Sequence, residues 1–178
     1  MYRIEASIVG EAPILFNRRV TDPDEPAGHK KSLDEKAAEA AERVYRDEHG
    51  LYWPAWNLKR AILDGCRAAG IKNGKASMVP TLQAAIFPER EPRFGVNTFD
   101  AIHETLGRVP PRTGSQVTVR RPMLDRGWVL TFGIQVVLDP VRHETIRTSL
   151  ETAGLLVGIG SWRPDYGRFT VRDWKVTK

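Results

Sequence analysis

The chain has 178 residues, of which 41% are hydrophobic and 28% are charged, and its formal net charge is +5. This balance is typical of one globular domain over residues 1–178, and the positive charge favours polyanionic partners. A single cysteine, Cys66, excludes an internal disulfide and a multi-cysteine metal site. No apolar run is long enough to span a membrane and no signal-peptide core is present, so we expect a cytoplasmic protein.

Apolar and polar residues alternate from Tyr2 to Ile8, which predicts a half-buried strand. The polar segment 18–31 contains two prolines and a glycine, and we expect it to be a loop. A capping-box pattern at Ser32 predicts that a helix begins there and runs to about Glu48. Residues of about 17–50 therefore form a predicted insertion after the first strand.

A second helix is predicted after Pro54, because apolar residues recur on one stripe and Gly70 follows as a stop signal. The segment from about residue 71 to residue 114 is irregular and basic. One short helix over residues 98–106 is expected within it.

Residues Ser115–Met123 are expected to form a strand. Because Pro122 cannot donate a ladder hydrogen bond, this strand is predicted to lie at the edge of the sheet. Residues Trp128–Leu138 alternate without a break, which is typical of a central strand.

A helix is predicted to follow Asp139 and Pro140 and to stop at Gly154. The last strand covers Phe169–Val176, and its apolar phase shifts between Val171 and Trp174, which predicts a bulge or bend. Without the insertion and the irregular segment, the order is strand, helix, strand, strand, helix, strand. This βαββαβ order predicts an α+β, ferredoxin-like fold with an antiparallel sheet.

A glycine-rich loop lies between the predicted last helix and the last strand. Its glycines allow backbone N–H groups to approach a ligand, its arginines supply forks for phosphate, and its aromatic rings offer faces on which bases stack. The glycines follow a helix rather than a strand, so they do not match a dinucleotide-binding fingerprint. The loop residues expected to contact nucleic acid are Gly158, Gly160, Trp162, Arg163, Tyr166 and Arg168.

Two further pairs of basic residues extend this prediction to a groove that follows phosphates. Arg120 and Arg121 point to opposite faces of the Ser115–Met123 strand. Arg121 has the phase of the inward residues, and we expect it beyond the edge of the core because burying a charge is costly. Lys59 and Arg60 lie near the positive end of the second helix, where a phosphate binds favourably.

Three function classes follow from these patterns. Binding of RNA or single-stranded DNA without catalysis is the leading interpretation, with no cofactor, no metal ion and no catalytic residue. A metal-independent endoribonuclease is the enzyme alternative, because His29 lies beside two lysines and can act as an acid or base. The third alternative is a protein-interaction subunit or inhibitor that docks on a nucleoprotein complex through segment 18–31.

The order of elements, with the glycine-rich segment 158–169 before the last strand, resembles the RAMP superfamily of CRISPR-associated RNA-binding proteins. Segment 53–62, which reads Trp-Pro-Ala-Trp-Asn-Leu-Lys-Arg-Ala-Ile, looks like the segment that opens the first helix in that superfamily. The resemblance implies that the loop approaches RNA and that other subunits, or copies of the chain, are partners. It implies binding more than cleavage, and it extends to phage and mobile-element members.

Overall fold

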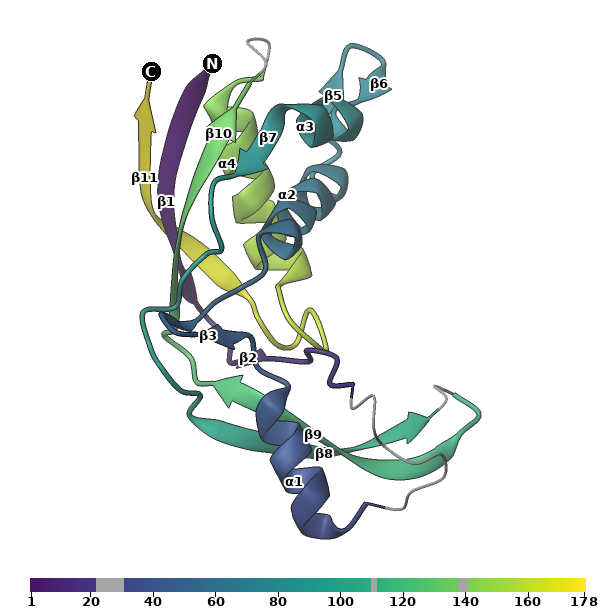
Figure 1. Ribbon diagram of the computed structural model, residues 1–178. Coiled ribbons are helices and arrows are strands. Elements are labelled where there is room, and N and C mark those ends of the chain that lie inside the picture. Colours follow the sequence, from purple (N-terminus) through teal and green to yellow (C-terminus); the bar gives the residue numbers. More distant parts are fainter. Residues whose placement is uncertain (22–30, 110–111, 138–140) are drawn as a thin grey trace.

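The computed structural model describes residues 1–21, 31–109, 112–137 and 141–178. An antiparallel four-stranded sheet forms one part of the molecule, and helices cover one of its faces (Figure 1). A smaller antiparallel sheet forms the other part, with helix α1 across it (Figure 1). The elements of the first part are β1 (Tyr2–Gly10), β7 (Ile86–Pro88), β10 (Val129–Val136), β11 (Phe169–Thr177), α2 (Ala55–Ala68), α3 (Val79–Ala85) and α4 (His143–Thr152).

The four strands lie in the order β11-β1-β10-β7, and every neighbouring pair is antiparallel. Alternation along β1 directs Ile4, Ala6 and Ile8 to one face, where all three are buried in the core. The predicted central strand is confirmed, since β10 lies between β1 and β7. The predicted α+β class with an antiparallel sheet is confirmed as well.

Helices α2 and α4 pack closely because the residues between them are small. A Cβ on Gly65 would overlap the carbonyl oxygen of Ser149, and it would also press on Ala153. Ser149 is fully buried, and its hydroxyl donates to the Thr145 carbonyl at 2.7 Å. This close packing joins the C-terminal half of α2 to α4 and to the residues that follow α4. None of the described helices has both the length and the hydropathy that a membrane span requires.

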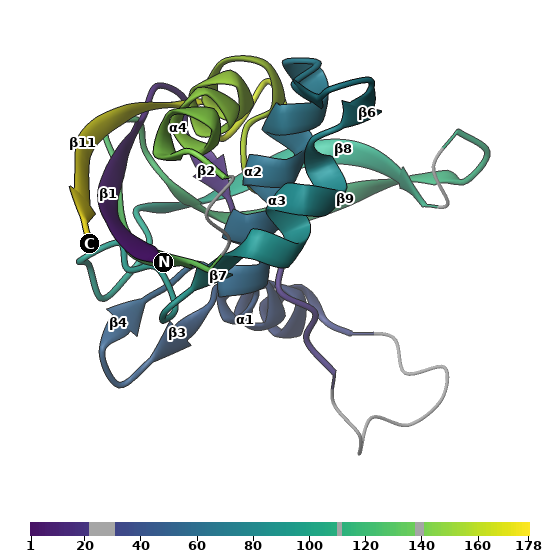
Figure 2. The same cartoon turned by 90° about the horizontal axis from the view of Figure 1, so that it is seen from above.

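The smaller sheet has the order β2-β9-β8, built from β2 (Ile14–Leu15), β8 (Ala101–Val109) and β9 (Ser115–Leu124). Strands β8 and β9 form a long hairpin that projects beyond the helices (Figure 2). Helix α1 (Leu33–Glu42) contacts β9.

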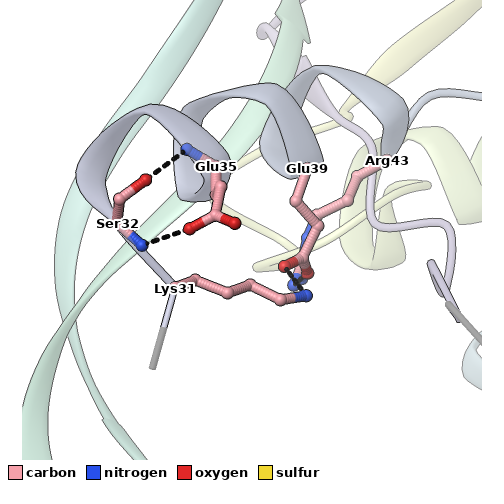
Figure 3. A network of polar contacts seen from close by, with 5 residues as sticks. All are labelled: Lys31, Ser32, Glu35, Glu39 and Arg43. Carbon is pink, nitrogen blue, oxygen red and sulfur yellow. Dashed lines mark hydrogen bonds and ion pairs between the residues drawn. The ribbon is translucent and has the colours of Figure 1, made fainter. Parts of the chain in front are cut away.

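The start of α1 confirms the predicted capping box. The backbone N–H of Glu35 donates to the Ser32 hydroxyl at 3.2 Å, and the Ser32 N–H donates to the Glu35 carboxylate at 2.6 Å (Figure 3). In the next turn the Glu39 carboxylate pairs with Lys31 at 2.9 Å and with Arg43 at 2.6 Å (Figure 3). Hydrogen bonds from these two cations lower the pKa of Glu39.

The expected end of this helix near Glu48 was wrong, because α1 ends at Glu42. Beyond it Val44 is buried, and Tyr45 packs edge-on against Trp53, so the chain leaves the helix to join the core. Strands β3 (Arg46–Asp47) and β4 (Gly50–Leu51) then form a hairpin, and β5 (Lys72–Asn73) and β6 (Ala76–Ser77) form another after α2.

The helix expected over residues 98–106 was also wrong, because residues 101–106 belong to strand β8 and residues 98–100 precede it without helical structure. Every residue of β8 is paired with a residue of β9, from Ala101 opposite Met123 to Val109 opposite Ser115. Pairing with a distant strand therefore overrides the local preference of this segment.

The Ser115–Met123 segment is a strand, as predicted, but its assignment to the edge of the main sheet was wrong. It belongs to the smaller sheet, where it pairs with β8 along its length and with β2 only at Met123 and Leu124. The edge beside β10 is occupied by the three-residue strand β7, which ends at Pro88.

Two expectations for the last third of the chain had opposite outcomes. Gly154 does not stop the helix, which continues as the π-helical turn η1 (Ala153–Val157) and ends at Gly158. Gly154 instead permits close packing, since a Cβ there would overlap the Phe169 carbonyl oxygen. The predicted bulge in β11 is confirmed: Ser7 is opposite Asp173 and Ile8 is opposite Val171, which leaves Arg172 as the extra residue. Asp139 and Pro140 lie outside the described residues.

Candidate nucleic-acid interface

The glycine-rich loop has a fixed shape because its backbone is bonded to the segment that follows β1. The N–H of Ser161 donates to the Leu15 carbonyl at 3.0 Å, and that of Gly167 donates to the Pro13 carbonyl at 2.8 Å. Gly158 and Gly160 have φ angles of 72° and 90°, as expected for glycines that a loop requires. A Cβ on Gly160 would lie 2.8 Å from the Leu15 carbonyl oxygen, so this position also needs glycine for space.

One side of the loop packs on the β8–β9 hairpin. His103 and Arg121 are cross-strand partners, so their side chains share one face of the smaller sheet. The guanidinium of Arg121 lies over the Trp162 ring, 4.3 Å from its centroid, and His103 Nε2 lies 3.2 Å from the Tyr166 hydroxyl oxygen. We call His103, Arg121, Trp162 and Tyr166 the hairpin cluster.

Arg121 differs from an ordinary surface arginine. Its Nε and Nη1 atoms are buried and have no hydrogen-bond partner among the described residues. Burial lowers the pKa of the guanidinium, and the charge of Arg43 lowers it further. Arg121 is thus half-buried beneath the loop, on the sheet face rather than in the apolar core. A buried cation without a bonded anion favours an anionic ligand.

The other side of the loop faces the start of α2 and forms a cavity of about 220 Å³, which we call the α2–loop pocket. Helix α2 contributes Trp56, Asn57 and Arg60, and the loop contributes Gly160 and Arg163. The loop also contributes Ile159 and Ser161, and residues from three other places complete the lining: Leu15 and Asn17, Tyr45, and Trp53.

The two arginines of this pocket, Arg60 and Arg163, make few polar contacts within the protein. Arg163 Nη1 donates to the Gly158 carbonyl at a long 3.4 Å. Arg60 forms an ion pair with Asp64 one turn along α2 at 3.1 Å, and its side chain remains 65% exposed. Both guanidinium groups retain donors for a phosphate, because each offers five N–H groups.

Four residues predicted from the sequence do not join either site. The first is Gly158, whose carbonyl accepts from Arg163 but which does not line the pocket. Lys59 lies over the Phe87 ring at 4.6 Å, where burial lowers its pKa. Arg120 forms an ion pair with Glu104 at 2.6 Å on the sheet face opposite Arg121. Arg168 lines a separate cavity between η1 and β11. Arg60, Arg163 and Gly160 meet in the α2–loop pocket, whereas Arg121, Trp162 and Tyr166 meet in the hairpin cluster.

Sequence analysis missed two residues of this interface. His103 lies in a segment expected to be irregular or helical, so nothing indicated that it pairs with Arg121. Trp56 lies in the first turn of α2 with 68% of its surface exposed, although tryptophan is usually mostly buried. His29 lies outside the described residues. In the described parts of the chain, no three metal-ligating side chains are grouped to hold an ion.

No protein-family model matches the chain, and no curated protein matches it. Its fold is similar to that of a chain in the cryo-EM structure of the Type III-B Cmr-beta bound to cognate target RNA. The two share 13% identity with a TM-score of 0.62, over 99% of this chain and 61% of the other, so this chain spans about three fifths of its neighbour.

A weaker likeness is to the Csm3-Csm4 subcomplex of the type III-A CRISPR-Cas interference complex. Here the TM-score is 0.43 and the identity 16%, over 98% of this chain and 77% of the other. At 13% identity, the likeness to the Cmr-beta chain establishes a shared fold alone.

Proposed function

We propose that residues 1–178 act as one RAMP-like domain that binds RNA, or single-stranded DNA, without cleaving it, as a subunit of a CRISPR-type nucleoprotein assembly. One observation carries this proposal: the glycine-rich loop meets arginines from two distant elements. Arg60 of α2 lies on one side of the loop and Arg121 of β9 on the other, while Arg163 belongs to the loop itself. A phage or mobile-element origin is part of the same hypothesis.

Physical chemistry supports a polyanionic strand as the ligand. Guanidinium groups form bidentate hydrogen bonds with phosphate, and arginines spaced along a surface match successive phosphates of one strand. The fold is similar to that of a chain from an assembly solved with target RNA, which supports RNA in particular.

The test is binding of labelled RNA and DNA oligonucleotides over a series of salt concentrations. Arg163→Ala and Arg60→Ala should each weaken binding and flatten the slope of log affinity against log salt by about 0.7 per lost phosphate contact. Arg147→Ala is the matched control, because Arg147 forms the same i,i+4 pair as Arg60, with Glu151 at 2.9 Å on α4. Unchanged affinity and slope in both loop-side variants would contradict the proposal.

Metal-independent cleavage of RNA is a second candidate, favoured by the hairpin cluster. His103 provides a base or acid, Tyr166 a hydroxyl and Arg121 a cation within one group of contacts. Incubation of the purified chain with a mixed RNA pool in chelator tests it. Specific products that vanish in His103→Ala, or in His29→Ala, support cleavage; intact RNA supports binding alone. If the chain neither retains nor cleaves nucleic acid, docking through segment 18–31 becomes the leading hypothesis.

A further inference from the structure

We infer that the α2–loop pocket binds one unpaired nucleotide, with its base stacked on the indole of Trp56 and its phosphate between Arg60 and Arg163. This inference rests on the proposed function and adds to it the state of the strand and the residue that recognises the base. It distinguishes single strands from duplexes, not RNA from DNA.

The exposure of Trp56 is the first observation. Its indole is 68% exposed at the rim of the pocket, in the first turn of a helix that is otherwise well packed. An exposed indole offers a flat face on which a base can stack. Trp162, by contrast, already has the Arg121 guanidinium over its ring. Of these two tryptophans beside the loop, Trp56 is the one whose ring is open to a base.

The second observation is an unused hydrogen-bond donor in the pocket wall. Trp53 lines the pocket with only 5% of its surface exposed, and its Nε1 has no hydrogen-bond partner among the described residues. Buried indole N–H groups normally find an acceptor. Trp53 thus brings to the pocket wall an indole N–H that no described residue satisfies.

The start of α2 itself is not the phosphate site. The first N–H of the helix, that of Ala55, already donates to the Glu91 carboxylate. Anion binding in this pocket therefore depends on the Arg60 and Arg163 side chains, which line it from the helix and from the loop. Trp56 and Arg60 lie four residues apart on α2, so both project from the same helix face.

This arrangement excludes a paired base. Both faces of a base inside a duplex are covered by its neighbours, so only an unstacked base presents a face to an indole. A cavity of about 220 Å³ admits one strand at most. The backbone bonds of Ser161 and Gly167 hold the loop wall in place, so the pocket is largely preformed.

The experiment compares a single-stranded oligonucleotide with an abasic strand of the same length, since the two carry equal charge. The unaltered chain should prefer the base-bearing strand. Trp56→Ala should lose about 5- to 100-fold in affinity for that strand, bind the abasic strand unchanged and keep its salt slope. Trp56→Phe should retain part of the preference. Leu155→Ala, which alters another side chain that is 69% exposed, is the control and should change neither affinity.

The outcomes separate this inference from the proposed function. Suppose that Arg163→Ala weakens binding, but that Trp56→Ala binds the base-bearing and the abasic strand as the unaltered chain does. The strand then binds at the loop without stacking on Trp56, so the inference fails while the proposed function stands. If neither variant matters, both fail. Binding of a duplex as tightly as its separated strand would also overturn the inference.

Discussion

Arg121 and Trp162 lie 41 positions apart in the sequence and join two parts of the molecule. The guanidinium carbon of Arg121 lies 4.3 Å from the centroid of the Trp162 ring. The contact fastens the glycine-rich loop to the β8–β9 hairpin. It also covers a cation whose Nε and Nη1 have no hydrogen-bond partner in the described part of the chain.

Arg121→Ala should loosen the loop. Cation–π contacts contribute about 0.5–2 kcal/mol, so the amides of Ser161 and Gly167 should exchange with solvent faster in this variant. Hydrogen exchange read by mass spectrometry measures the effect. Arg120→Ala is the control, because Arg120 pairs with Glu104 on the opposite face, and it should leave both amides protected. Equal exchange in the two variants would show that Arg121 does not hold the loop.

Gly167→Ala should destabilise the fold more than Gly95→Ala. The two glycines have nearly equal φ angles, 73° and 72°, so the conformational cost of about 1–2 kcal/mol is common to both. Only at Gly167 would the new Cβ overlap the Ile159 carbonyl oxygen, whereas nothing lies within 4 Å at Gly95. Urea unfolding should give the larger loss for Gly167→Ala. If Gly167→Ala lost no more unfolding free energy than Gly95→Ala, the glycine-rich loop would be able to shift and relieve the overlap, and the prediction would be wrong.

Asp47 should contribute a pH-dependent part of stability. Hydrogen bonds from Arg93, at 2.6 and 2.7 Å, are the main reason that the pKa of this carboxyl is lowered to about 2. Because the folded pKa lies below the ordinary value of 3.8, the stabilisation is complete above about pH 4 and is lost as the pH falls through about 2. Carboxyl titration by NMR checks the pKa. In Arg93→Ala it should rise toward 3.8, and an unchanged pKa there would contradict the assignment.

Tyr2 should contribute a part of the folding stability that is lost at alkaline pH. Burial, with a smaller effect from Glu144, raises the pKa of its phenol to about 12, and the hydroxyl donates to the Val141 carbonyl at 2.7 Å. The folded pKa lies above the ordinary value of 10.0, so the stabilisation is complete below about pH 10 and is lost as the pH rises through about 12. Tyr2→Phe should cost about 1 kcal/mol near neutral pH and remove this alkaline dependence. Unfolding at a series of pH values measures both, and parallel curves for the two proteins would refute the prediction.

The parts of the fold that sequence analysis predicted correctly are those with a local cause. Strands β1 and β10 bury one face, so alternation marks them, and the capping box needs only Ser32 and Glu35. The bulge at Arg172 follows from the shifted phase of neighbouring apolar residues.

The parts that escaped prediction depend on distant partners. Residues of β8 become a strand by pairing with β9, and β7 is too short to give a periodic pattern. The residues of the candidate site also fall into those with a local sequence signal and those that depend on distant partners. The glycines of the loop were predicted from their neighbours, but the pairing of His103 with Arg121 and the exposure of Trp56 follow only from tertiary packing.

The extra residue in β11 has a consequence for the tolerance of this chain to deletion. Val171, Trp174 and Val176 lie opposite Ile8, Ala6 and Ile4, so the inward residues are spaced by three and then by two. Removing Arg172 would restore strict alternation and leave Trp174 on the inner face. Removing Thr170 instead would move the buried Phe169 opposite Val9, on the outer face of the sheet. A one-residue shortening is therefore expected to be accepted at Arg172 and resisted two positions earlier.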